Sequence, residues 1–473
     1  MPTEKSPARL TEHVAQFAAA TRFEDIPPEV IRLSKQAVLD CFAVAFAGSV
    51  AEGSAILRRH IEKFGFTVGA GTVAATIYGS NMRVPAQFAA LANGTAMHSD
   101  DYDDTHNPSR IHPSASVASA LFAVAEAEDR SGRDLLTAFN VGVEVSCKIS
   151  IATAGAHYGR GFHSSGTIGV FGATAAVCNV RHASPEITLA ALGTAGSEAA
   201  GVRENFGTMA KPLHAGRAGE TGILASDLAA MGFTSAPTVL EGPRGFFECY
   251  VGKCDEDVIM NTLGKPWTFV TDASIAIKPF PSGRLTHPAM CELEKIVLAN
   301  NILPDQVERI GVRTNRLLPG NLTYHRPVTG LEGKFSMEFC LASMLVLRRA
   351  GLVEFTDEVV NRRDIQDAIG KIDYTCYSDE EAAANNYPLL TTFLEVALKD
   401  GRTFAGRVDY ARGSPPQPMT WEDGANKFRG GAQFAQWPQD KTERIIEMVF
   451  DLEKLKKMSA LTALMAGAGE ASR

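Results

Sequence analysis

Residues 98–116, HSDDYDDTHNPSRIHPSAS, carry the densest group of reactive side chains in the chain. Four aspartates and three histidines fall within fifteen positions of this stretch. Carboxylates this close repel one another, which is typical of a metal site, a bound cation or a group that holds a proton. An aspartate-rich run can bind Mg²⁺ through two carboxylates, but the spacing here matches no zinc or calcium motif. The alternative is a capped loop, which explains only part of the run.

Two further stretches combine histidine with basic residues or glycine. His163, in YGRGFHSSGTIGVFGA, precedes a glycine-rich helix start, where free amides and the helix dipole favour an anion. Its alternative is a loop histidine packed on the helices. Lys211, His214 and Arg217, in AKPLHAGR, are spaced so that the first two share a helix face. Their neighbours are apolar and small, which favours a cleft over a solvated basic face.

Cations also gather farther along the chain. Lys278, Arg284 and His287 occur in the Pro/Gly-rich stretch IAIKPFPSGRLTHPA, and Lys334 stands at a predicted helix start. The alternatives are an exposed linker and an ordinary exposed lysine. Taken together, these cations suit a small polycarboxylate substrate.

Chemistry on such a substrate often starts with removal of a proton next to a carboxylate. Cations must then stabilise the developing charge while a histidine or aspartate takes the proton. The sequence holds no Gly-x-Ser-x-Gly motif, no P-loop and no Rossmann fingerprint after a strand. Acyl-serine, nucleotide and hydride chemistry are therefore not supported.

Composition narrows the remaining classes of protein. The chain has 473 residues, 45% apolar and 21% charged, with a formal charge of −8. It has no basic run, which argues against a nucleic-acid partner. The polar N-terminus predicts no signal peptide, and the early apolar run is too short to span a membrane. Eight scattered cysteines without a Cys-x-x-Cys pair predict reduced thiols and a cytoplasmic location.

The periodicity predicts a mostly α protein with a second α+β domain. Residues 7 to about 265 are predicted to be helical throughout, with small residues that permit close helix packing. After residue 270, QVERIGVRTN predicts a strand and KFSMEFCLASMLVLRRAG a helix ending at Gly351. FLEVALKDGRTFAGRVDY predicts a hairpin turning at Asp400 and Gly401. We expect an all-helical domain over residues 1–270 and 412–473, with an α+β lid domain at 271–411 inserted between its helices.

Several of these stretches together resemble one family. The run around residues 98–116, GRGFHSSGTIGVFGATAA, FGTMAKPLHAGRAGETGILASDLAAMGFT, KPFPSGRLTHPA, GLEGKFSMEFCLA and GSPPQPMTWEDGANKFRG resemble the MmgE/PrpD family, in the family's order. That family includes 2-methylcitrate dehydratases, cis-aconitate decarboxylases and iminodisuccinate epimerases. The resemblance implies a helical domain with a smaller lid, a homodimer, and activity without a cofactor or metal.

The resemblance also implies roles for individual residues. Matches to decarboxylase site residues are Asp101, Thr105, His112, His163, Lys211 and Lys278. The substrate-binding set is expected to include Thr105, Lys278, Arg284, His214 and Lys334. We expect Lys211 and Lys278 to bind carboxylates, His163 or His112 to move the proton, and Asp101 to orient a histidine.

Neither subfamily pattern fits this chain throughout. The decarboxylases carry a second-domain tyrosine for which Lys334 and Phe335 are the nearest positions here, and this chain has one extra residue between Thr105 and His112. Methylcitrate dehydratases read FNDTW where this chain reads YDDTH. The implied function is a cofactor-free lyase, either dehydratase or decarboxylase, on a citrate-like acid. The alternatives are an epimerase of an amino-dicarboxylate such as iminodisuccinate and a non-catalytic homologue.

Overall fold

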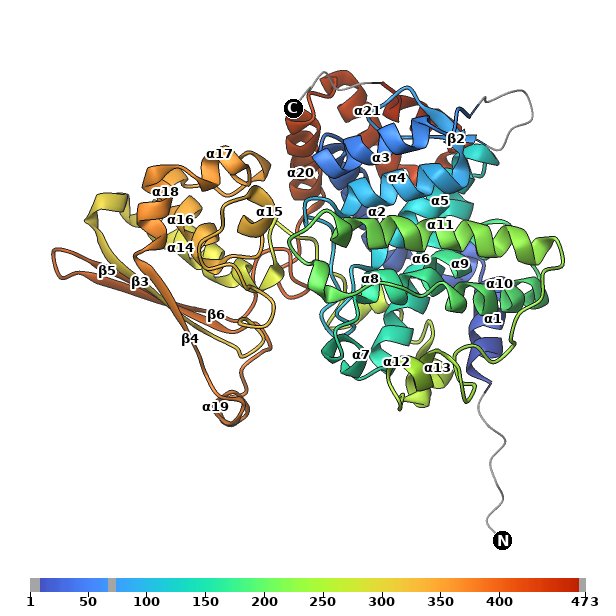
Figure 1. Ribbon diagram of the computed structural model, residues 1–473, viewed down its shortest axis with the longest axis horizontal. Helices are drawn as coiled ribbons and strands as arrows, with labels where there is room; N and C mark the ends of the chain where they lie inside the picture. The colour runs from blue at the N-terminus through green and yellow to red at the C-terminus, as the bar shows by residue number, and fades with distance from the viewer. Residues whose placement is uncertain (1–8, 67–73, 468–473) are drawn as a thin grey trace, which may run out of the picture. The chain divides into compact units, whose positions relative to one another are not determined.

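The computed structural model describes residues 9–66 and 74–467, which form two compact units (Figure 1). Unit 1 comprises the described residues up to Ser99, then Asp103–Ile275, and those from Trp421 onward; unit 2 comprises Asp100–Tyr102 and Ala276–Thr420. The units therefore change at 275/276 and 420/421, later than the expected 270/271 and 411/412. The assignment of Asp100–Tyr102 to unit 2 was not expected. This assignment reflects contacts within unit 2, such as the hydrogen bond that the Tyr102 hydroxyl donates to the Pro279 carbonyl at 3.2 Å.

Long apolar helices form the centre of unit 1. In α5 and α9 almost every residue is buried, because alanines and glycines let neighbouring helices approach on several sides. Among the described residues, helix α6 alone is by itself long and apolar enough to cross a membrane, yet 94% of its apolar window is buried within the protein, as in a core helix. The central helices are α2 (Pro28–Ser49), α4 (Ala86–His98), α5 (Pro113–Ala127), α6 (Gly132–Ala152), α9 (Gly169–Val180) and α11 (Ala210–Ala230).

Helices α4 and α11, which both carry candidate site residues, cross in close contact. A Cβ on Gly94 would lie 2.8 Å from the Gly216 Cα, and a Cβ on Gly216 would lie 2.2 Å from the Leu91 carbonyl oxygen. Both positions therefore need glycine. The close contact holds His98, the last residue of α4, and Lys211, in the first turn of α11, on one packed framework.

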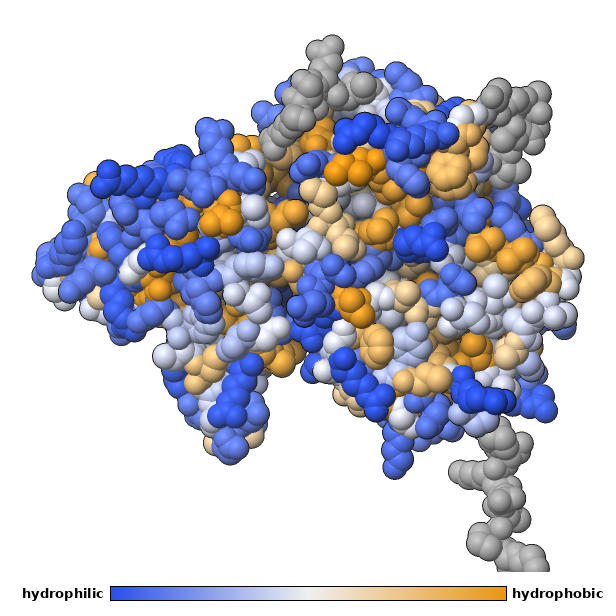
Figure 2. Space-filling view, viewed as in Figure 1, coloured by the Kyte–Doolittle hydropathy of each residue, from blue (hydrophilic) through white to orange (hydrophobic). Residues whose placement is uncertain are grey.

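Shorter elements complete the first part of unit 1. The helices are α1 (Leu10–Ala20), α3 (Glu52–Glu62), α7 (Ala156–Gly159), α8 (Ser164–Thr167), α10 (Pro185–Ser197), α12 (Phe246–Tyr250) and α13 (Glu256–Thr262). The expectation of helix throughout this region is wrong at one place, where β1 (Ala74–Thr76) and β2 (Arg83–Pro85) form an antiparallel pair. Three residues per strand are too few to show a period of two in the sequence. Hydrophilic and hydrophobic residues are interspersed on the face of unit 1 that Figure 2 shows.

The C-terminal helices pack on one of the first. Helix α20 (Trp421–Phe434) lies against α2, followed by α21 (Gln439–Phe450) and the single turn α22 (Ser459–Thr462). The Lys427 ammonium lies 2.6 Å from Asp40 of α2, with both side chains buried. The Phe46 ring of α2 stacks on Phe428 and packs against Trp437.

Unit 2 is an α+β unit built on a four-stranded sheet of order β4-β3-β5-β6 (Figure 1). Strands β3 (Val307–Thr314) and β4 (Ile372–Cys376) are parallel, whereas β5 (Thr392–Leu398) is antiparallel to β3 and to β6 (Thr403–Val408). Helix α14 (His287–Asn300) contacts β5 and β6, and α16 (Met337–Leu347) contacts α14, β4 and α18 (Arg363–Ile369). The remaining helices are α15 (Gly330–Gly333), α17 (Asp357–Val360) and α19 (Asp379–Ala384).

The predicted strand and hairpin are confirmed, and Gly401 occupies the turn with φ of +89°. The predicted end of the helix at Gly351 is wrong, because α16 ends at Leu347 and Arg348 adopts a left-handed conformation. The expected fold class, mostly α with a second α+β domain, is confirmed.

Candidate active site

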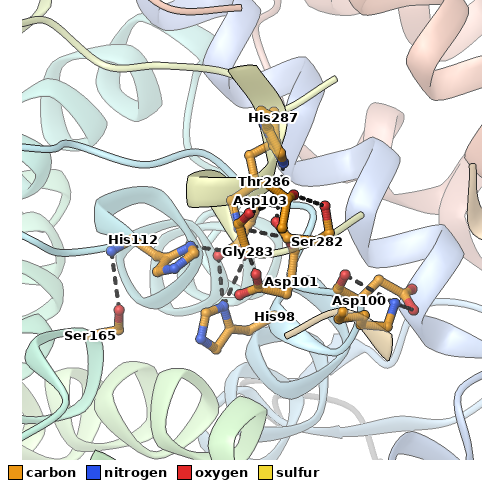
Figure 3. A network of polar contacts seen from close by, with 12 residues as sticks. His98, Asp100, Asp101, Asp103, His112, Ser165, Ser282, Gly283, Thr286 and His287 are labelled. Atoms are coloured by element: carbon orange, nitrogen blue, oxygen red, sulfur yellow. Dashed lines mark hydrogen bonds and ion pairs between the residues drawn. The ribbon is translucent and has the colours of Figure 1, made fainter. Parts of the chain in front are cut away.

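Two imidazoles from different segments of unit 1 meet at one buried carboxylate. His98 ends α4, Asp103 follows in the loop, and His112 immediately precedes Pro113, the first residue of α5. The His98 Nδ1 lies 2.8 Å from Asp103 Oδ2, and the His112 Nδ1 lies 3.2 Å from Asp103 Oδ1. Figure 3 shows both rings directed at this carboxylate. Asp103 therefore holds two histidines by the same ring nitrogen.

This contact fixes the proton on His98. A carboxylate only accepts hydrogen bonds, so Nδ1 of His98 carries the hydrogen and Nε2 keeps its lone pair. Burial lowers the pKa of His98 to about 3, so the ring is neutral. Burial alone would raise the pKa of Asp103, but the adjoining His112 and His98 outweigh it and hold that pKa well below its ordinary value. The Nε2 of His98 is buried and has no hydrogen-bond partner among residues 9–66 and 74–467.

A second pair of imidazoles lies beside the first. The His163 ring stacks on His98 with centroids 5.4 Å apart, and its Nδ1 lies 2.9 Å from the Nδ1 of His214. Burial, followed by the influence of His98, lowers the pKa of His163 well below its ordinary value. The Nε2 of His163, like that of His98, is buried without a hydrogen-bond partner in the described part of the chain. The two stacked rings thus each hold a buried Nε2 that makes no hydrogen bond among the described residues.

Lys211 supplies a positive charge to this group. It is buried in the first turn of α11, and its Nζ lies 5.3 Å from the centre of the Phe206 ring. The same Phe206 ring packs edge-on against His163, with centroids 5.1 Å apart. The Lys211 charge contributes to the lowered pKa values of both His98 and His163. Lys211 is 4% exposed, so the alternative of a solvated position is wrong for this residue, and its expected place in a cleft stays a prediction.

The rest of the acidic run in unit 1 has a structural task. Asp104 accepts from the Ser114 hydroxyl at 2.5 Å and from the Ser114 amide, and burial raises the pKa of Asp104 to about 8. His106 pairs with the Ser109 hydroxyl at 2.7 Å and bridges to Ile111 through its backbone. Thr105 between them is buried. The capped-loop interpretation therefore holds for Asp104 and His106 but not for Asp103.

In unit 2, two lysines clamp the two preceding acids of the run. The Lys278 ammonium donates to the Asp101 carbonyl at 2.6 Å and to its carboxylate at 2.8 Å, with the lysine side chain 1% exposed. The Lys334 ammonium contacts the carbonyl and carboxylate of Asp100 in the same way, both at 3.0 Å. The alternative of an exposed Lys334 is wrong, because its side chain is only 4% exposed.

The Asp101 carboxylate contacts Lys278, and Asp101 also acts electrostatically on His287, whereas Asp103 contacts His98 and His112. The expected role of Asp101 in orienting a histidine stays a prediction. Arg284 begins a short 3₁₀ turn that leads into α14, and burial lowers its pKa to about 10. His287, the first residue of α14, lies 3.2 Å from the Ser282 carbonyl through Nε2 (Figure 3).

Sequence reasoning did not assign a role to two residues of these groups, His98 and Asp103. Both lie within the run that was singled out, and the five-residue separation in His-x-x-x-x-Asp was the available signal.

His98, Asp103 and His112 also offer one ligand atom each within 4.8 Å of one another, a spacing that could hold a metal ion. The facing nitrogen and carboxylate atoms are already 2.8–3.2 Å apart, the separation of a direct hydrogen bond or ion pair. An ion among them would have to replace those contacts. The set is therefore satisfied by its own members.

Comparison with known proteins now decides the family. A model of the MmgE/PrpD N-terminal domain matches residues 12–258, and a model of the MmgE/PrpD C-terminal domain matches residues 280–454. The chain belongs to the MmgE/PrpD family. The resemblance drawn from the separated motifs is thus confirmed, and it extends over both units.

Relatives of this family member include several decarboxylases. The cis-aconitate decarboxylase of Homo sapiens is 31% identical over 470 residues, covering 97% of this chain and 95% of the relative. That of Mus musculus is 29% identical, with 97% and 93% covered, and that of Aspergillus terreus is 24% identical, with 96% of each covered. Family membership and these relatives support an enzyme of the dehydratase or decarboxylase type.

Proposed function

We propose that the protein is a lyase that decarboxylates cis-aconitate or a closely similar unsaturated tricarboxylate. The observation that carries the substrate is the 31% identity to the human cis-aconitate decarboxylase over 97% of the chain. The arrangement in unit 1 supports the reaction class, because it combines neutral imidazoles, a carboxylate that holds them and a buried ammonium group.

The reaction defines what these groups must supply. A carbon–carbon bond to one carboxylate breaks, CO₂ leaves, and the electron pair moves through the allylic system to a new terminal double bond. The carbon at the other end then takes up one proton. Each turnover therefore consumes one proton and spreads negative charge over the substrate before that proton arrives.

The residues of unit 1 suit those two demands. Lys211 stabilises the remaining carboxylates and the charge that develops. His163 or His112 delivers the proton through Nε2, while Asp103 keeps the Nδ1 of His98 and His112 engaged. A buried carboxylate behind an imidazole stabilises the imidazolium form, so His112 and His163 stand in unlike surroundings and suit different protonation states.

In unit 2 we propose that Lys278, Lys334 and Arg284 contribute to substrate recognition. Lys278 and Lys334 are already paired with Asp101 and Asp100, so their first effect is to hold residues 100–101 in place. We further propose that the enzyme is a homodimer in the cytoplasm and acts without a metal ion or cofactor.

Proton NMR on the full-length protein tests this function. Incubation with cis-aconitate in deuterated buffer should give the two vinylidene protons of itaconate, released CO₂ and one deuterium in the new methylene group. Parallel samples contain 2-methylcitrate and iminodisuccinate. An alkene formed only from 2-methylcitrate would assign a dehydratase, and α-proton exchange only in iminodisuccinate would assign the epimerase. No turnover of any of the three would reject the proposed substrate class.

A further inference from the structure

His98 and His112 contact the carboxylate of Asp103, whereas the contact between His163 and His214 joins two imidazole nitrogens. Their Nδ1 atoms are 2.9 Å apart, so only one hydrogen lies between two atoms that can each accept. Burial lowers the pKa of both rings, with Lys211 adding to the effect on His214. Both rings are therefore neutral, and whichever one donates determines the tautomer of its partner.

The backbone hydrogen bonds of His163 do not determine the tautomer of its ring. Its amide donates to the Gly201 carbonyl at 3.1 Å, and its carbonyl accepts from the Thr167 hydroxyl at 3.1 Å. Neither contact touches the ring. The side chains that act on the ring electrostatically are His98 of α4, His112 ahead of α5, and Lys211 and His214 of α11. Among them, His214 alone has a described hydrogen bond to the ring.

The surroundings of His214 are shaped to hold its ring. A Cβ on Gly201 would lie 3.2 Å from the His214 Cγ, and one on Gly166 would lie 3.0 Å from the His214 Cβ. Gly201 also has φ of +138°, a conformation that favours glycine. Two glycines from segments far apart in sequence thus leave room for this imidazole, which is half-buried one helical turn after Lys211.

We propose that His214 is a positioning residue whose Nδ1 accepts the Nδ1–H of His163 and so reserves the Nε2 of His163 for the proton transferred to the substrate. It does for His163 what Asp103 does for His98, but without a negative charge. This role rests on the proposed proton-transfer chemistry of the site. It replaces the expectation that His214 binds substrate.

The proton balance follows from this arrangement. A proton from solvent first protonates the Nε2 of neutral His163. The resulting imidazolium keeps Nδ1–H on His214 and gives Nε2–H to the substrate carbon. The N–H bond breaks, the C–H bond forms, and His163 returns to the neutral form with its contact to His214 intact. Because His214 is neutral, it stabilises this imidazolium less than a carboxylate would, so the proton is more readily released.

Two variants separate acceptance of a hydrogen bond from simple packing. In His214→Asn, the amide oxygen stands about where Nδ1 stood and still accepts, whereas His214→Leu fills space without accepting. We expect His214→Leu to lower kcat about 10²-fold with little change in KM, the lower end of the range for lost acid–base function. His214→Asn should retain most of kcat. His60→Leu, on the surface helix α3, is the control for loss of an imidazole. Equal losses in the Leu and Asn variants, or a rise in KM alone, would reject the role.

A spectroscopic readout decides the tautomer without turnover. In protein labelled with ¹⁵N-histidine, the His163 signals are assigned from their loss in His163→Gln. The parent protein should show a protonated Nδ1 and a bare Nε2 on His163, and His214→Leu should lose that preference. A parent His163 protonated at Nε2 would overturn the inference even if cis-aconitate is turned over. Failure of the NMR substrate assay alone would reject the proposed function and leave the tautomer result standing.

Discussion

The His98 Nδ1 lies within 3.0 Å of both carboxylate oxygens of Asp103, with both side chains buried. Together with the ion pair to His112, this contact makes Asp103 the residue that holds the Nδ1 atoms of both His98 and His112. It also explains why so many acids occur together. Asp103 serves the histidines, Asp104 holds the loop, and Asp100 and Asp101 pair with lysines of unit 2.

Replacing Asp103 with asparagine should therefore remove the tautomer control of His98 and His112. The amide can donate to Nδ1 and favour the wrong tautomer, so we expect kcat to fall by about 10²- to 10⁴-fold with a smaller effect on KM. Asp272→Asn, at an exposed position, is the matched control. Steady-state kinetics together with thermal melts measure the effect. An activity loss that only follows the loss of folded protein would contradict it.

Lys211→Ala should raise KM and lower kcat together. Its charge contributes to binding the substrate carboxylates and to stabilising the charge that develops, and a lost donor of that kind costs about 10²-fold or more in rate. Lys63→Ala, at the exposed end of α3, should change neither constant. If Lys211→Ala altered KM alone, the residue would only bind substrate, and the second part of its proposed role would be wrong.

The buried pair Lys278–Asp101 should show strong coupling in a double-mutant cycle. Lys278→Met removes the ammonium group that contacts the buried Asp101 carboxylate. Breaking a buried pair in this way lowers the free energy of unfolding by about 3–5 kcal/mol. The double variant Lys278→Met/Asp101→Asn should recover part of that stability. The exposed pair Arg362–Asp364 should couple by less than about 1 kcal/mol. Chemical denaturation measures all four corners, and additive effects would show that the pair is not coupled.

Acid should destabilise the protein through histidines that are neutral when folded. Burial lowers the pKa of His157 to about 4, against about 6.5 in an unfolded chain. Between these values the unfolded state binds more protons, so the stability contribution is complete above pH 6.5 and falls as the pH drops towards 4. His157→Gln should flatten this part of the profile of melting temperature against pH. An unchanged slope would mean that His157 does not titrate in this range.

Activity should survive EDTA treatment, because the Asp103 group is satisfied by its own hydrogen bond and ion pair. Removal of tightly held metal is checked by elemental analysis of the protein before and after chelation. Loss of activity on chelation, restored by Zn²⁺ or Mg²⁺, would show that His98, Asp103 and His112 bind an ion.

The class of each unit was readable from sequence because periodicity survives in long elements. The hairpin around Gly401 was visible because β5 alternates buried and less buried residues and a glycine marks the turn. The end of α16 was not, since Arg348 stops the helix by adopting a left-handed conformation that its residue type does not favour. Strands as short as β1 and β2 carry too few residues to reveal a pattern.

The candidate site was predictable as a set of segments but not as a set of contacts. Residue types and spacing brought out His112, His163 and Lys211, yet they could not tell which of four nearby aspartates reaches an imidazole. That choice depends on backbone conformation, including φ of +49° at Asp101. His214 was found by its spacing from Lys211, but its contact with His163 depends on how α11 packs near Gly166 and Gly201.

The pairing of α20 with α2 has a consequence for the order in which the chain is synthesised. Helix α2 leaves the ribosome early, with Asp40 and Phe46 on the face that α20 later covers. Lys427 and Phe428 follow only after the whole of unit 2 has been translated. During that interval α2 lacks the contacts that α20 makes with it, so the packing of unit 1 is completed only late in translation, after unit 2 has been synthesised.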